Sequence, residues 1–270
     1  MLFIRKRLFL LALALFAKEE AFDADVDGFE LESYTFHEFV GSGFPDESLA
    51  TRAKEIEISG KNLKPCMQSI VKDLSNLKRG PIGQIMQRFS RGISGYNWVL
   101  KDDSLAGGTA QTEVSSYKAS SRSITTTFDS QAWPNATDLS WARTVMHESL
   151  HGYLSLEFYT DKNEFVRKYP AMMQDFNILH EWDAVHHEEF ARSFVFSIAF
   201  SLEEYGRMKG YELPKQFYED MSWAGLKDTE AFKKLSESDQ ARILDTIRSE
   251  LTGKDCAGNV KAPVGIDAGC

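Results

Sequence analysis

The sequence predicts an α+β fold, with a small mixed sheet, a helix that carries two histidines, a second histidine-bearing helix and a helical C-terminal part. Three observations predict this fold. Short β-branched runs lie between residues 96 and 130. An apolar pattern with helical spacing begins after a capping residue near position 137. A second long helical pattern covers 181–209 and contains adjacent histidines.

The composition indicates one globular domain with tails. Of the 270 residues, 43% are hydrophobic and 26% are charged, and 5 Trp, 9 Tyr and 19 Phe are enough for a substantial core. The formal net charge is -9, which disfavours a surface that binds duplex nucleic acid. We therefore expect no nucleic-acid partner. The composition does not determine the oligomeric state.

The N-terminus, residues 1–17, is typical of a secretory signal peptide. Its three cations (Arg5, Lys6 and Arg7) precede an apolar run at 8–17, and acidic residues follow. This run is shorter than the about 20 residues that span a bilayer, but it fits a signal peptide. We expect a secreted or periplasmic protein that keeps no stable membrane anchor after cleavage. Residues 18–60 are interpreted as an acidic leader or linker, and a propeptide role for them is left open.

The main domain is expected over 61–253, and it begins with two helices and then strands. Apolar residues from Leu63 to Leu77 recur with helical spacing, and Gly80-Pro81 separates this helix from a shorter one. The runs 96–101 and 121–130 are strand-like, and the second suits an edge or half-exposed strand because it alternates only partly. The turn-rich segment between them is expected to be a hairpin or a loop. Helices are also expected over 214–251.

The next helix carries the residues that indicate chemistry. Thr137 or Asp138 is expected to cap it. His147 and His151 follow at i and i+4, so both rings project from one face at the separation that two ligands of a tetrahedral zinc require. Glu148 is rotated by about 100° from His147, where its carboxylate reaches a zinc-bound water rather than the metal. The motif therefore predicts two zinc ligands and a general base.

A catalytic zinc needs a third protein ligand and an open fourth position. A compact arrangement, with glycine three residues after His151 and a histidine three further on, is excluded because Leu154 and Glu157 occupy those positions. The third ligand must come from farther along the chain. His187 is the first choice because it lies on an apolar stripe of the second helix that should face inward.

Other residues of that second helix stay open as ligands. Glu188 is the main rival, since some zinc peptidases take a glutamate from a second helix. His186, which is expected to face solvent, is a further candidate, as are Asp183 and His180. The two tyrosines nearest the motif, Tyr153 and Tyr159, are expected in the core rather than at the reaction centre.

The three cysteines have no zinc-ligand spacing. In an exported protein, we expect Cys256 and Cys270 to close the glycine-rich tail, 254–270, as a small disulfide loop. Cys66 lies in the first expected helix and is interpreted as a small buried hydrophobic residue.

Two stretches, ATDLSWARTVMHESLHGYL and DAVHHEEFARSFVFSIA, resemble the small zincin-like metallopeptidases of Bacteroidetes and their phages, often called SprT-like. The similarity extends over roughly residues 60 to 210. The resemblance implies a zincin fold, bound Zn²⁺ and hydrolysis of a protein or peptide substrate, and it places the family's downstream histidine at His187. In zincins an edge strand before the metal helix commonly pairs with the substrate, and Ile124–Phe128 is the candidate here.

The leading hypothesis is therefore a zinc metallopeptidase in which His147, His151 and His187 bind Zn²⁺ and Glu148 is the general base. The alternative is an exported protein that keeps a zincin scaffold and binds a partner without catalysis, with a structural metal or none. A cytosolic SprT-like protease is a third hypothesis, which an uncleaved N-terminus would favour.

Overall fold

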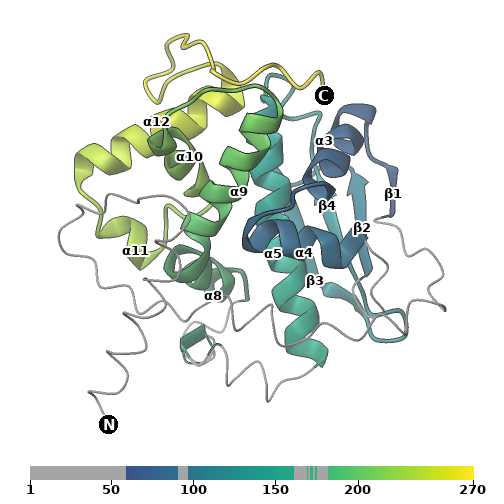
Figure 1. Ribbon diagram of the computed structural model, residues 1–270. Coiled ribbons are helices and arrows are strands. Elements are labelled where there is room, and N and C mark those ends of the chain that lie inside the picture. The colour runs from purple at the N-terminus through teal and green to yellow at the C-terminus, as the bar shows by residue number, and fades with distance from the viewer. Residues whose placement is uncertain (1–58, 91–96, 161–168, 170, 173, 175–181) are drawn as a thin grey trace. The chain divides into compact units, whose positions relative to one another are not determined.

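The computed structural model describes residues 59–90, 97–160, 169, 171–172, 174 and 182–270, and these residues form an α+β fold (Figure 1). The expected signal peptide at 1–17, the acidic leader up to residue 58 and His180 lie outside the described residues, as do the side chains of Tyr159 and Asp183.

Four strands form one mixed sheet in the order β1-β2-β4-β3. They are β1 (Ser59–Asn62), β2 (Asn97–Asp102), β3 (Ala110–Lys118) and β4 (Ser123–Phe128). Strands β1, β2 and β4 are parallel, and β3 pairs antiparallel with β4, which confirms the hairpin. The prediction that 121–130 is an edge or half-exposed strand is wrong, because β4 lies inside the sheet and is almost wholly buried, and β3 lies at the edge. The polar threonines of β4 suggested an exposed face, but Thr126 and Thr127 are buried.

Helices α3 (Pro65–Ser75) and α4 (Gly80–Ser90) confirm the two helices expected before the strands. Pro65 stands at the start of α3, where its missing N–H costs no hydrogen bond. Gly80, at the start of α4, has φ +73, a conformation that glycine adopts without strain. Just before it, the backbone N–H groups of Lys78 and Arg79 donate to the carboxylate of Glu204 at 3.1 and 3.2 Å. This ties the turn before α4 to a later helix.

The central element is α5 (Asp138–Thr160), which contacts β3, β4, α3, α4 and three helices of the C-terminal half (Figure 1). The hydroxyl of Thr137 accepts from the N–H of Ser140 at 3.1 Å, so Thr137 caps the helix as expected. Every residue from 138 to 155 is buried. A helix buried on all sides has no polar face, so the polar residues inside it need partners within the protein.

The second histidine-bearing helix spans the predicted region in three parts. They are α8 (Trp182–Glu189), a π-helical segment η2 (Phe190–Phe194) and α9 (Val195–Met208). A π segment holds more residues per turn than an α-helix, so it rotates the side chains that follow it. Such segments occur frequently at functional sites, and this one directly follows the histidines.

The C-terminal part is helical, as expected, with α10 (Lys215–Ser222), α11 (Glu230–Lys233) and α12 (Glu237–Thr252). The glycine-rich tail then packs against the start of α5. The carboxylate of Glu250 accepts hydrogen bonds from the Thr137 hydroxyl at 2.7 Å and from the Gly265 N–H at 3.0 Å. The N–H of Asp138 donates to the carbonyl of Ile266 at 2.9 Å. The tail therefore belongs to the same folded unit as the main domain.

The disulfide of the tail differs from the predicted one. Cys270 bonds to Cys66 of α3, across 204 residues, and Cys256 is exposed and free. The predicted Cys256–Cys270 loop and the interpretation of Cys66 as a buried hydrophobic residue are both wrong. The physical reason is that the tail passes the start of α5, where the N–H of Ala268 donates to the carbonyl of Ala136 at 3.3 Å, and ends beside α3, where Lys64 Nζ donates to the carbonyl of Cys270 at 2.7 Å. Sequence spacing favoured the near pair, whereas tertiary packing joins the distant one.

No helix within the described part of the chain is both long enough and apolar enough to cross a membrane.

Candidate metal centre

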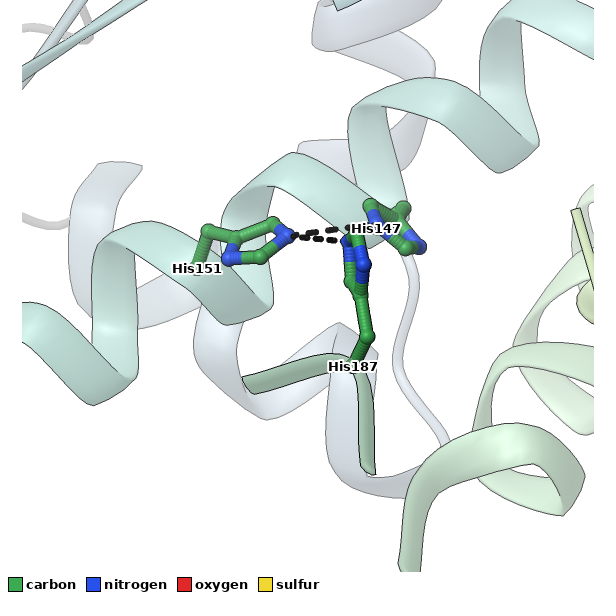
Figure 2. Close-up of side chains that lie close together, drawn as sticks. All are labelled: His147, His151 and His187. Carbon is green, nitrogen blue, oxygen red and sulfur yellow. Dashed lines mark hydrogen bonds between the residues drawn. The ribbon is translucent and has the colours of Figure 1, made fainter. Parts of the chain in front are cut away.

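Three histidine rings converge at the contact between α5 and α8 (Figure 2). His147 and His151 project from one face of α5, and His187 reaches them from α8. The distances between the three Nε2 atoms are 3.2 Å for His147 and His151, 3.2 Å for His151 and His187, and 3.3 Å for His147 and His187. The structure thus brings together the three residues that the sequence predicts as zinc ligands.

This triangle of nitrogen atoms has the size of one face of a zinc tetrahedron. With Zn–N bonds of about 2.0 to 2.1 Å, two ligand nitrogens of a tetrahedral site lie about 3.3 Å apart. The three measured separations, 3.2, 3.2 and 3.3 Å, fall at that value. Among the described residues, the possible ligands that gather here are three imidazoles, so the cluster offers three nitrogen donors to one ion.

Burial keeps two of these imidazoles in the form that binds metal. His147 is 4% exposed and His151 is 5% exposed. The pKa of each lies well below 6.5, because burial disfavours the imidazolium and the neighbouring imidazoles add repulsion. Both rings are therefore neutral at neutral pH, as a metal ligand must be. The apolar ring of Phe190 packs against them, with centroids 4.9 and 4.6 Å away.

His186 lies behind the cluster rather than in solvent. Its ring is fully buried, and its Nδ1 is 2.9 Å from the Nδ1 of His151. The expectation that His186 faces solvent is wrong. Adjacent residues of a helix point about 100° apart, so both histidines can approach α5, His186 fully buried and His187 partly exposed. His186 contacts a ligand candidate and does not join the triangle of Nε2 atoms.

Glu188, the main rival for the third ligand, points elsewhere. Its Oε1 accepts from the backbone N–H of Glu230 at 3.0 Å, at the first turn of α11. A carboxylate in that position stabilises the N-terminus of a helix. Of these two neighbours on α8, His187 is the one placed beside His147 and His151.

Glu148 is buried next to the sheet. It is 5% exposed, and its Oε2 accepts a hydrogen bond at 2.7 Å from the hydroxyl of Thr112 on β3. Arg143, one turn earlier on α5, is 5% exposed. Its pKa is lowered to about 10 because burial disfavours the cation, although the charge of Glu148 opposes that shift. Sequence reasoning missed both Thr112 and Arg143, since neither belongs to a motif.

A glycine outside the motif also contacts the cluster. Gly225, between α10 and α11, has φ +86, and a Cβ added to it would come within 3.2 Å of Cε1 of His147. Glycine thus allows the backbone to approach the ring closely. Tyr153, by contrast, is 1% exposed and lies under the guanidinium of Arg88, which confirms its place in the core.

The His147, His151 and His187 group could hold a metal ion, and its donors are all nitrogen. Comparison with known protein families, with curated proteins and with solved structures finds no match to this chain.

Proposed function

We propose that the protein is a zinc-dependent metallopeptidase of zincin-like architecture, related to the SprT-like group that its sequence resembles. In this proposal His147, His151 and His187 hold Zn²⁺ and Glu148 is the general base. The observation that carries the proposal is the triangle of Nε2 atoms, 3.2 to 3.3 Å apart, next to a buried glutamate of the same helix.

The donor set favours zinc over the hard divalent cations. Magnesium and calcium prefer oxygen ligands, whereas neutral imidazoles in a tetrahedral arrangement suit zinc. Three protein ligands with an open fourth position are typical of catalytic zinc, since structural zinc sites are usually closed by four. A zinc ion held there would supply Lewis acidity toward a peptide carbonyl and toward a bound water.

Glu148 would carry the proton transfers. A buried carboxylate one residue after the first ligand can accept a proton from the attacking water and deliver it to the leaving amine. Its Oε2 accepts a hydrogen bond from Thr112 of the edge strand β3. This contact supports the proposal because it ties the base to the strand along which a substrate would bind.

The edge strand β3 supplies a surface for an extended substrate. Because β4 is an inner strand, the expected substrate strand at Ile124–Phe128 is replaced by β3 (Ala110–Lys118). Among the described strands, β3 pairs only with β4, and a peptide would add by backbone hydrogen bonds to the edge that pairs with no described strand. We propose a protein or peptide substrate that binds along this edge.

Export of the protein is part of the proposal. The signal-like N-terminus suggests it, and the Cys66–Cys270 disulfide adds support because disulfides persist mainly in oxidising compartments. We therefore propose a secreted or periplasmic enzyme.

The test combines metal analysis with one variant of the base. The purified protein is expected to carry one zinc per chain and to cleave members of a broad peptide library. Glu148→Gln should keep the zinc and lose hydrolysis, whereas the matched change Glu188→Gln on α8 should keep both. Hydrolysis that survives Glu148→Gln would refute the mechanism. Zinc without turnover would favour the alternative, a non-catalytic binding protein that uses the same scaffold.

A further inference from the structure

We propose that a buried hydrogen-bond chain fixes the orientation of the Glu148 carboxylate. This chain runs from the indole of Trp98 through the hydroxyls of Thr126 and Thr112. This makes Thr112 and Thr126 positioning residues for the general base. The inference rests on the proposed function for its catalytic meaning, but the hydrogen-bond chain itself is a property of the folded protein.

The chain consists of three short hydrogen bonds in series. Trp98 Nε1 is 2.7 Å from the hydroxyl of Thr126, which is 2.6 Å from the hydroxyl of Thr112. The Thr112 hydroxyl is in turn 2.7 Å from Oε2 of Glu148. All four residues are buried, with exposures of 1%, 0%, 5% and 5% along the chain. The path therefore runs inside the protein from β2 to α5.

The direction of every hydrogen bond follows from the groups at the two ends. An indole N–H can only donate, so the Thr126 hydroxyl accepts from Trp98. An ionised carboxylate can only accept, so the hydroxyl of Thr112 donates its one hydrogen to Glu148. Thr126 must then donate to Thr112. Each hydroxyl accepts once and donates once, and all the dipoles point toward the carboxylate, which strengthens the last bond.

The sheet register creates this chain. Thr112 and Thr126 are directly paired across β3 and β4, and Trp98 of β2 is paired with Ile124, two residues before Thr126. Side chains two residues apart on a strand share a face, so the three groups line up on the face of the sheet that meets α5. Thr127, the next residue of β4, points to the other face, and its buried hydroxyl has no hydrogen-bond partner among the residues that the structure describes.

The consequence for the site is a fixed base. Glutamate has three side-chain torsions, and a buried carboxylate on a helix can adopt more than one of their combinations. The hydrogen bond from Thr112 to Oε2 selects one of them. A base that is positioned before the substrate arrives loses no time or free energy to reorientation during the reaction.

The kinetic arm of the test uses variants of the threonines in the zinc-loaded protein. Thr112→Val, which keeps the shape and removes the hydroxyl, is expected to lower kcat by about 10- to 100-fold with KM and zinc content unchanged. Thr112→Ser restores the hydroxyl and should restore most of kcat. Thr126→Val should lower kcat less, and Thr126→Ser should restore it.

Thr127→Val is the matched control, since it removes a buried threonine hydroxyl from the same strand but not from the chain. It should leave kcat unchanged. If Thr112→Val keeps the wild-type kcat, or if Thr112→Ser fails to restore a lost kcat while circular dichroism shows a folded protein, the positioning role is refuted.

A second arm needs neither zinc nor turnover. The indole N–H resonance of Trp98, assigned by its loss in Trp98→Phe, is followed by ¹H–¹⁵N NMR. Glu148→Gln should shift this resonance, because the hydroxyls of Thr126 and Thr112 link the indole of Trp98 to the carboxylate of Glu148. Glu157→Gln, a change on the same helix outside the chain, should not shift it.

If the Trp98 indole resonance has the same position in Glu148→Gln as in the wild type, the hydrogen-bond chain is refuted, whether or not the protein is active. A wild-type protein that cleaves no peptide would overturn the proposed function, and the NMR arm would then decide alone whether the chain orients Glu148. The two failures are therefore distinguishable.

Discussion

The Nδ1 atoms of His151 and His186 lie 2.9 Å apart inside the protein. The other ring nitrogen of His151, Nε2, points into the histidine triangle. If Nε2 binds the metal, Nδ1 carries the hydrogen and donates it, so Nδ1 of His186 must accept. With a metal bound, His186 would fix the tautomer and the ring orientation of His151, a task that carboxylates or carbonyls perform at many zinc sites.

The first prediction concerns His186. His186→Phe keeps a ring in the buried position but removes the acceptor, so zinc affinity should fall by about 10- to 100-fold while the stoichiometry stays at one. His186→Gln, whose amide oxygen can accept, should recover part of the loss. Competition with a chromogenic chelator measures both. An unchanged affinity in His186→Phe would show that His151 needs no such partner.

The second prediction separates the two neighbours on α8. His187→Ala removes one corner of the nitrogen triangle and should lower zinc affinity by at least about 100-fold, because a two-histidine site lacks a third protein ligand. Glu188→Ala should leave zinc binding unchanged, since its carboxylate contacts the N–H of Glu230. Metal content after dialysis against a weak chelator is the measurement. The reverse pattern would assign the third ligand to Glu188.

The third prediction concerns the disulfide. Cys270→Ser should lower the free energy of unfolding by about 2 to 5 kcal/mol, because the Cys66–Cys270 bond restricts the unfolded chain. Cys256→Ser should have no such effect, since that thiol is exposed and free. Denaturant unfolding and a peptide map without reduction test both points. A Cys256–Cys270 peptide in the map would contradict the pairing described above.

The fourth prediction is a pH dependence at Asp129, which follows β4. Its carboxylate accepts from the N–H groups of Leu105 at 2.9 Å and Ala132 at 3.0 Å, and these bonds lower its pKa below 3.8. Because the folded pKa is the lower one, the charged group stabilises the fold above about pH 3.8, and this contribution is lost as the pH falls through the folded value.

Asp129→Asn should therefore melt at a lower temperature than the wild type at neutral pH. The difference should shrink toward zero once the pH is below the folded pKa, where both side chains are neutral. Thermal melts across this range provide the measurement. If the difference in melting temperature between the two proteins grows as the pH falls, the pKa of Asp129 is raised rather than lowered in the folded protein, and the prediction is wrong.

The sequence predicted those parts of the fold and site that depend on local periodicity. The i, i+4 spacing placed His147 and His151 on one face of a capped helix, and the apolar stripe selected His187. Both helices are present where expected, and Thr137 caps the first. Local patterns suffice here because one helical turn brings residues three and four apart together.

The pairings between distant segments were decided only by the tertiary structure. Packing of α8 against α5 buried His186, the pairing order of the sheet made β3 the edge strand, and the return of the tail joined Cys270 to Cys66. The same holds for Thr112, which meets Glu148 across 36 residues of sequence. None of these contacts repeats with a helical or strand period, so each depends on how elements pack and cannot be derived from spacing along the chain.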